Sequence, residues 1–366
     1  MNLEQAITQR LVSKKLVTPD LAISKKLREA ILRLSDSFTR NRADLPASYF
    51  DDETNRLAYL AGFVLTNAEK VKLCLSQVKK LLPQTGRLSL LDVGSGPGTA
   101  VFAASELLSD RDAVFTALEK NKSVLQEAKT LERALQKKHG VDWLVGGVEK
   151  TPSSPFDLII AANVLNELDA QQQLKTVKEL LSTGRLVVLI DPALKQTARD
   201  LMKLRDQLVV GSLASVIAPC THQKPCPMLS ANKRDWCHFY IEWKRPKLIE
   251  ALDNATGLDH RYLKLSYLSL RARRSNLDLE NKIAASPAAP RNDNYRAVSS
   301  PIKTKGKLEL VVCGNGELRR LRRLDKNASE TNRAFGQAKR GDLVSFQCSD
   351  SQIGPACPFS ISRAPK

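Results

Sequence analysis

Apolar positions recur at two spacings along the chain, and the change of spacing divides the sequence. Up to about residue 85 they recur at helical spacing, as at Leu27, Ile31 and Leu34. From Arg87 onward, short apolar runs alternate with helix-like segments; the runs cover residues 88–94, 113–119, 141–146, 156–162 and 184–191. Five buried strands with helices between them predict a doubly wound α/β sheet.

The same pattern predicts the organisation of the rest of the chain. We expect a helical region over residues 1–85, the sheet domain over 86–275 with a further strand at 263–272, and a loop or linker over 276–305. A hairpin is expected over 307–324 around Gly314-Asn315-Gly316, with 342–348 as its third strand. Together these form a small β extension over 306–350, and 351–366 is expected to be a disordered tail.

Charge narrows the class of partner. Lysine and arginine number 57 against 39 acidic residues, a formal net charge of +18, which attracts a polyanion if it is displayed on one face. We expect RNA rather than DNA, because no DNA-reading helix motif stands out. The longest apolar runs are too short to span a bilayer, so no membrane partner is expected.

The N-terminal sequence and the number and spacing of the cysteines indicate in which cellular compartment the protein is expected. Glu4 lies early in an N-terminus without an apolar run, which is not the pattern of a signal peptide. Seven cysteines, an odd number clustered in one segment, do not indicate a disulfide framework. We therefore expect a protein of a reducing compartment, located in the cytoplasm.

A glycine loop follows the first strand of the predicted sheet. Residues 90–100, LLDVGSGPGTA, let the backbone approach a ligand at a helix N-terminus. Glu119 ends the second strand, where a carboxylate can accept both ribose hydroxyls, and Asn163 follows the fourth. This pattern looks like the S-adenosylmethionine site of class I methyltransferases, a Rossmann-like fold, rather than a nicotinamide site. The expected cofactor residues are Asp92, Gly94, Ser95, Gly96, Gly98, Glu119 and Asn163.

A methyltransferase fold does not by itself predict methyl transfer. The stretch AANVLNEL after the fourth strand lacks the prolines and aromatic residue of amino-methylating enzymes of nucleic acids. Pro219-Cys220 falls too far along the chain for a carbon-5 cytosine enzyme. Asn166 and Glu167 are candidates for a catalytic role only by location, and helix capping explains them equally well. The catalytic residues stay unassigned.

The segment 218–239 concentrates thiols on a turn-rich stretch. Cys220, Cys226 and Cys237 supply three soft ligands for a metal centre, and the spacing differs from that of a zinc ribbon. A fourth ligand is needed. The available residues are His222, His238, Cys313, Cys348 and Cys357, and core packing explains a strand-end cysteine such as Cys313 equally well. Trp236 and Phe239 are expected to shield the centre from water.

These motifs together resemble one family, the methyltransferase-like proteins of the small ribosomal subunit, which include mitochondrial-type ribosome assembly factors. The resemblance runs through residues 45–50, 90–100, 156–168, 218–239, 265–270 and 308–320. It implies a [4Fe-4S] cluster on four cysteines, Cys220, Cys226, Cys237 and Cys313. Zinc at the same thiols is a separate, weaker alternative. The resemblance also implies binding to small-subunit ribosomal RNA and the pre-ribosomal small subunit.

Two functions follow from these expectations. The first is a small-subunit-associated RNA-binding protein, acting in ribosome assembly or translation, whose methyltransferase fold and cysteine-rich metal insertion serve structure and sensing. The second is an active S-adenosylmethionine-dependent methyltransferase of ribosomal RNA, favoured by the complete glycine loop and Glu119. The arginines of 317–324 are expected either to contact RNA or to form a solvated strand edge.

Overall fold

The computed structural model describes residues 1–40, 48–136, 139–273, 294–348 and 351–363. Residues 45–47 of the first family motif and 276–293 of the expected linker lie outside these ranges. The chain divides into two compact units. The first contains Met1–Leu75, Leu81–Glu167 and Ile241–Leu263, and the second contains Ser76–Lys80, Leu168–Tyr240 and Lys264–Lys366.

Helices of the first unit confirm the expected helical N-terminal region. Ser24 caps α2 by accepting the amide N–H of Leu27 at 3.2 Å, and the buried stripe of α2 recurs every three or four residues, ending at Leu34. Arg10 on α1 donates two hydrogen bonds of 2.8 Å to the Glu127 carboxylate on α6, which ties these helices together. The α-helices of this unit are α1 (Leu3–Ser13), α2 (Lys25–Thr39), α3 (Glu53–Tyr59), α4 (Leu65–Ser76), α5 (Thr99–Leu107), α6 (Lys122–Leu135) and α10 (Lys247–Thr256), with a π-helical turn at Leu60–Val64.

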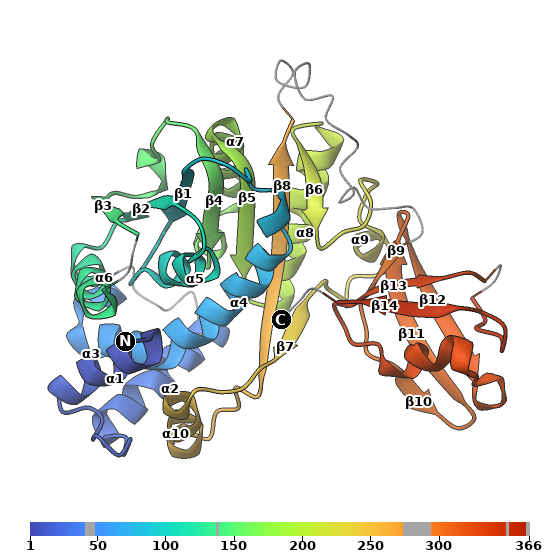
Figure 1. Ribbon diagram of the computed structural model, residues 1–366, viewed down its shortest axis with the longest axis horizontal. Helices are drawn as coiled ribbons and strands as arrows, with labels where there is room; N and C mark the ends of the chain where they lie inside the picture. The colour runs from blue at the N-terminus through green and yellow to red at the C-terminus, as the bar shows by residue number, and fades with distance from the viewer. Residues whose placement is uncertain (41–47, 137–138, 274–293, 349–350, 364–366) are drawn as a thin grey trace. The chain divides into compact units, whose positions relative to one another are not determined.

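An eight-stranded sheet contains all five strands expected from the apolar runs. The strands are joined in the order β3-β2-β1-β4-β5-β8-β6, and β7 pairs with β8. Figure 1 shows β3, β2, β1 and β4 as neighbours, and β1 to β4 are parallel. Their bounds are β1 (Leu88–Val93), β2 (Ala113–Glu119), β3 (Val141–Val145), β4 (Phe156–Ala162), β5 (Gly184–Asp191), β6 (Ala214–Ala218), β7 (Phe239–Glu242) and β8 (Tyr262–Ala272).

The antiparallel strand β8 makes the sheet mixed. It runs antiparallel to β5 on one side and to β6 on the other. An antiparallel strand inserted between the fifth and sixth strands of a 3-2-1-4-5 sheet is the arrangement of class I methyltransferases. The fold expected from the sequence is therefore confirmed at this level. Helices α7 (Ala170–Thr183), α8 (Lys195–Val210) and α9 (Pro227–Ala231) belong to the second unit.

The C-terminal strands form a second sheet around a separate apolar core. The expected hairpin is present: β11 pairs with β12 from Lys307↔Leu324 to Gly314↔Glu317, across a turn with positive φ at Asn315 and Gly316. Wholly buried residues at its centre include Leu310, Val312, Leu321 and Phe335. The strands are β9 (Asn294–Ala297), β10 (Ile302–Thr304), β11 (Lys307–Gly314), β12 (Glu317–Leu324), β13 (Leu343–Phe346) and β14 (Phe359–Ser362).

Three expectations about this region are wrong. Strands β9 and β10 lie in the stretch expected to be a loop or linker, and β14 lies in the expected tail. Strand β13 pairs with β9 and β14 rather than extending the hairpin. These strands have only three or four residues each, so their apolar pattern is too short to be read without the partner strand.

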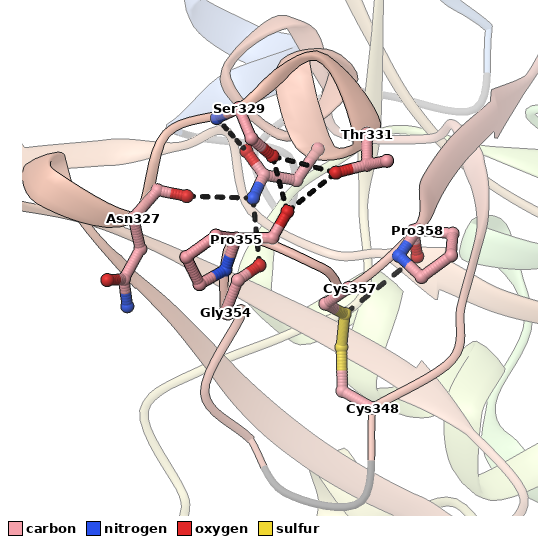
Figure 2. Close-up of a disulfide and its surroundings, with 9 residues drawn as sticks. Asn327, Ser329, Thr331, Cys348, Gly354, Pro355, Cys357 and Pro358 are labelled. Carbon is pink, nitrogen blue, oxygen red and sulfur yellow. Dashed lines mark hydrogen bonds between the residues drawn. A yellow bond between two sulfur atoms is a disulfide. The ribbon is translucent and has the colours of Figure 1, made fainter.

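A disulfide joins Cys348 to Cys357 beside the loop that follows β12 (Figure 2). The backbone carbonyl of Pro355, which lies between the two cysteines, accepts hydrogen bonds from the hydroxyls of Ser329 and Thr331 in that loop, both at 2.6 Å. The odd and clustered cysteines had not indicated a disulfide, and the bond corrects that expectation. While it is closed, neither sulfur can act as a thiolate ligand, so two of the candidates for a fourth metal ligand are excluded.

No helix in the described ranges is both long enough and apolar enough to cross a membrane.

Gly314 tests the packing of the C-terminal core. A Cβ at Gly314 would lie 2.5 Å from Tyr295 Cδ1, so Gly314→Ala forces the buried ring to move. We expect a loss of about 1–3 kcal/mol in the free energy of unfolding, measured by chemical or thermal denaturation. Gly354→Ala is the matched control, because a Cβ there meets no atom within 4 Å. Equal stability of the two variants would contradict this packing.

Candidate functional site

The glycine loop connects β1 to α5, and glycine is needed at its three positions for different structural reasons. All three have positive φ, of 68°, 53° and 84° at Gly94, Gly96 and Gly98. A Cβ at Gly94 would lie 2.7 Å from Val164, and one at Gly98 would lie 2.7 Å from Trp143. A Cβ at Gly96 would meet nothing within 4 Å. Gly94 and Gly98 therefore permit close packing, whereas Gly96 borders open space that a ligand can enter.

Glu119 is fixed beside this loop by backbone donors. Its two carboxylate oxygens accept the N–H groups of Gly96 and Asn121, each at 2.9 Å. Burial raises the pKa of Glu119 above its ordinary value, and these two hydrogen bonds oppose the rise. The carboxylate is thus held at the end of β2, with oxygen lone pairs left to accept further donors.

Asp92 is the most strongly perturbed carboxyl group of this region. It is buried at the end of β1, and burial raises its pKa to about 7, with the nearby Glu119 charge adding to the rise. Asp92 Oδ2, Ser95 Oγ and Thr99 Oγ1 are buried without a hydrogen-bond partner within the described part of the chain. Three orphaned polar atoms around one loop are what a site built for a polar ligand presents.

Asn163 completes the edge at which the parallel strands end. It follows β4 directly and has a φ of 59°, in the left-handed region. The register pairs Val93 of β1 with Leu118 of β2 and with Ala161 of β4, so the three strands end side by side. The structure therefore brings all seven predicted cofactor residues to one edge, the carboxyl ends of the strands, where open α/β sheets bind ligands.

The four cysteines singled out by the sequence also come together, within the second unit. Cys226, Cys237 and Cys313 pack against a buried cluster that contains Met202 and Met228. Cys220 lies near enough for its charge to raise the pKa of each of the other three thiols. None of the four is in a disulfide. Cys313 on β11 lies 76 residues beyond Cys237 in the sequence, and the fold brings it to the three cysteines of the segment 218–239.

Arg205 and Asp206 on α8 hold the cysteine segment in place. The Arg205 side chain is buried, and its guanidinium donates to the backbone carbonyls of Lys224 at 2.6 Å and His222 at 2.8 Å. It also donates to Asp206 at 2.6 Å, and the Asp206 carboxylate accepts the N–H of Cys226 at 3.0 Å. Neither residue was expected at this site from the sequence, because charged residues in a helical pattern are usually solvated.

Burial disfavours the ionised form of the thiol groups. It raises the pKa of Cys226, Cys237 and Cys313, and repulsion between neighbouring thiolates raises it further. A nearby metal cation reverses this balance, because it stabilises the thiolate form directly. Within the described ranges, however, no group of three or more histidine, cysteine, aspartate or glutamate side chains is arranged so that it could hold a metal ion.

The two histidines considered as ligands and the two aromatic residues expected to shield the centre differ in their positions relative to the thiols. His222 Nε2 lies 3.8 Å from Cys313 Sγ, and burial lowers the pKa of His222 to about 4, so its ring is neutral at pH 7. His238 Nδ1 lies 3.1 Å from the carbonyl oxygen of Trp236. Trp236 packs beside the cysteine cluster, whereas Phe239 is buried against the Tyr267 ring. Of the two aromatic residues expected to shield the centre, the structure therefore brings Trp236 to the thiols.

Comparison with known proteins gives three results. The model of the family described as "Mitochondrial small ribosomal subunit Rsm22" matches residues 53–344. The human protein "Ribosome assembly protein METTL17, mitochondrial" is 26% identical over 264 residues, which cover 66% of this chain and 57% of the human protein. The chain therefore spans just over half the length of that relative.

Solved methyltransferases are also similar, at low identity. The magnesium protoporphyrin IX methyltransferase of Synechocystis with bound S-adenosylmethionine is 12% identical, covers 67% of this chain and 97% of its own, and has a TM-score of 0.38. The ribosomal protein L11 methylase of Lactobacillus delbrueckii is 14% identical, with coverages of 55% and 78% and a TM-score of 0.33. At these scores the fold assignment rests on the strand order. The family match covers most of the chain, and the protein belongs to the Rsm22 family of the mitochondrial small ribosomal subunit.

Proposed function

We propose that this protein binds small-subunit ribosomal RNA and acts in the assembly of the small ribosomal subunit. Membership of the Rsm22 family carries this proposal, and the name of the human relative, a ribosome assembly protein, agrees with it. The net charge of +18 supports an RNA partner over a neutral one. We further propose that the site at Asp92 and Glu119 binds S-adenosylmethionine and that the four gathered cysteines bind a [4Fe-4S] cluster.

The residues at the strand ends suit S-adenosylmethionine chemically. Glu119 offers lone pairs to the two ribose hydroxyls, and Gly96 leaves space for the ligand to approach the backbone. Asp92, when ionised, is an acceptor for the ammonium group of the methionine end. Bound S-adenosylmethionine supplies an activated methyl group. An active methyltransferase of ribosomal RNA is the second candidate function, favoured by the unpartnered polar atoms that line the glycine loop.

The choice of a multi-iron cluster over a single zinc ion rests on the resemblance of the cysteine motif to that of its family. Around one zinc ion all four sulfurs must lie about 2.3 Å from the metal, which is a compact arrangement. In a [4Fe-4S] cluster each thiolate binds a different iron, so the four sulfurs surround a larger body. The cluster supplies positive charge that stabilises the thiolates, and Arg205 fixes the segment that presents three of them.

Binding to ribosomal RNA is the direct test of the main proposal. We expect the purified protein to bind 16S-type ribosomal RNA and small subunits, with the logarithm of affinity falling linearly as the logarithm of salt concentration rises. Filter binding and co-sedimentation at several salt concentrations measure this. Failure to bind either target at moderate salt would contradict the proposal.

Asp92→Asn tests the S-adenosylmethionine site through stability and binding together. The folded-state pKa of Asp92, about 7, lies above its unfolded value. The stabilisation that accompanies this raised pKa is therefore fully present below about pH 4, near the unfolded-state pKa, and is lost as pH rises through about 7. Asparagine removes that loss, so at pH 8 we expect the variant without ligand to be more stable by roughly 2–4 kcal/mol.

The same substitution is expected to weaken S-adenosylmethionine binding about tenfold or more, because a charge-assisted hydrogen bond is removed. Thermal unfolding and titration calorimetry give the two readouts. A stabilised variant that binds the ligand as tightly as the unchanged protein would contradict a role for Asp92 in binding. Absence of any binding by the unchanged protein would eliminate both the site and the methyltransferase alternative.

Cys226→Ser tests the cluster, with Cys348→Ser as the matched control. Cys226 is one of the gathered thiols, whereas Cys348 is held in the disulfide. We expect anaerobically purified protein to contain about four iron atoms per chain and to absorb near 400 nm. Cys226→Ser should lose most of the iron, and Cys348→Ser should keep it. Colourless protein loaded with zinc would reverse the choice of metal.

A further inference from the structure

The C-terminal sheet closes into a barrel. Strands β9, β11 and β12 form a meander in which β9 and β10 occupy the same edge of β11. The chain then passes through the short helix Glu330–Gln337 and returns as β13, which pairs antiparallel with β9. Strand β14 pairs antiparallel with β13. Four successive contacts thus lead from β12 back around to β14.

A short parallel pairing joins the two ends. The N–H of Arg322 on β12 donates to the carbonyl of Ser351, and the N–H of Ile353 donates to the carbonyl of Arg322, both at 2.8 Å. The stretch that leads into β14 therefore lies beside β12. With β9, β11, β12 and β13 as strands 1 to 4 and residues 351–362 as strand 5, the order is 1-2-3-5-4-1, with a helix between strands 3 and 4. The isolated bridge at Gln352 makes the contact between strands 3 and 5, and β14 makes the contact between strands 5 and 4.

This is the topology of the oligonucleotide/oligosaccharide-binding barrel, in which the outer face of strands 2 and 3 binds the ligand. In this protein that face is formed by alternate residues of β11 and β12. One end of it is covered, because Val311, Cys313 and Leu318 pack with Met202 and Met228. The other end carries Lys307, Arg320 and Arg322, with side chains 30%, 66% and 47% exposed.

One acidic side chain organises the basic residues of the exposed end. The Glu309 carboxylate lies 3.0 Å from Lys307 Nζ, 3.2 Å from Arg322 Nε and 3.6 Å from Arg320 Nη1. Three cations share one anion, so the patch keeps a net positive charge. Ile302, paired with Glu309 across β10 and β11, is 50% exposed and adds an apolar surface at the margin.

The other two arginines of β12 serve the barrel itself. Arg319 lies over the rings of Tyr295 and Phe346, and Arg323 lies over Phe335, at 5.3–5.8 Å from the ring centroids. The arginine strand therefore divides into a packing pair and an exposed pair, which neither of the two expectations from the sequence contained. Residues 294–362 contain 12 lysines and arginines and 6 acidic residues, so this region carries a net positive charge.

We propose that the exposed half of the β11–β12 face, formed by Lys307, Arg320 and Arg322 with Ile302 at its edge, binds single-stranded RNA. The charge favours phosphates, and barrels of this topology take strands of about 4–16 nucleotides. The inference rests on the proposed ribosomal RNA binding and specifies where on the chain, and to which form of RNA, it applies. Because half of the face is covered, a short unpaired segment fits the patch better than a duplex.

Fluorescence anisotropy on the full-length protein tests this with a labelled single strand of about 12 nucleotides and with the same sequence as a duplex. We expect the single strand to bind more tightly. Arg320→Ala with Arg322→Ala should weaken single-strand binding roughly tenfold or more near 0.1 M salt and lower the salt slope by about 1.4, the equivalent of two phosphate contacts. Glu309→Gln should strengthen binding, because it removes the anion that the three cations share.

Two control variants separate charge from folding. Lys175→Ala with Lys178→Ala removes two exposed cations from α7 and should leave binding unchanged. Arg320→Lys with Arg322→Lys keeps the charge and should keep most of the affinity. If Arg320→Ala with Arg322→Ala unfolds the barrel, Glu309→Gln still decides, since unchanged binding by that variant overturns the inference.

The outcomes distinguish this inference from the broader proposal. Ribosomal RNA binding that persists without loss in the double alanine variant, or equal affinity for duplex and single strand, overturns the barrel site while the proposed function survives. Failure of the unchanged protein to bind any RNA removes both. A patch that binds only a protein partner of the small subunit overturns the inference in the same way.

Discussion

The contact between the cysteine segment and strand β11 is the constraint on which the second unit depends. Cys226 and Cys237 come from a turn-rich segment with little regular structure, and Cys313 comes from a barrel strand. Such a segment has few backbone hydrogen bonds of its own, so its position must be fixed from outside. Arg205 supplies this from α8, through the carbonyls of His222 and Lys224. A bound cluster would add a covalent link between segment and strand, which makes metal loading and folding of this unit interdependent.

The first unit relies on a different device, the shared edge of parallel strands. The glycine loop, Glu119 and Asn163 are brought together by strand register alone, because strands β1, β2 and β4 end side by side. Buried polar atoms without partners are costly, and three of them remain around this loop. Their presence makes sense if a ligand completes the hydrogen bonds, and the raised pKa of Asp92 has the same explanation. Stability is thus lower here than packing alone would give.

The sequence predicted the features that depend on long local patterns. The apolar runs predicted the strands of the large sheet, and the motif LLDVGSGPGTA predicted the loop that β1 and α5 enclose. It did not predict strands of three or four residues such as β9 and β14, since they are defined by pairing with distant strands. The disulfide was not predicted, because an odd number of cysteines clustered in one segment does not indicate a disulfide framework, and the approach of Cys348 to Cys357 depends on the fold. Arg205 was missed because burial of an arginine depends on tertiary partners, which no local pattern reports. Convergence of Cys313 with the segment was implied only by the family resemblance.

Spectroscopy and metal analysis of Cys313→Ser, purified anaerobically beside the unchanged protein, test whether strand β11 supplies a ligand to the cluster. Of the four gathered cysteines, only this one belongs to the barrel, so its removal asks whether the two parts of the second unit share one metal centre. We expect the unchanged protein to be brown, with iron and acid-labile sulfide in equal amounts, and the variant to lose both. A variant that retains the full content of iron and sulfide would contradict this expectation, because the cluster would then be held without the barrel strand.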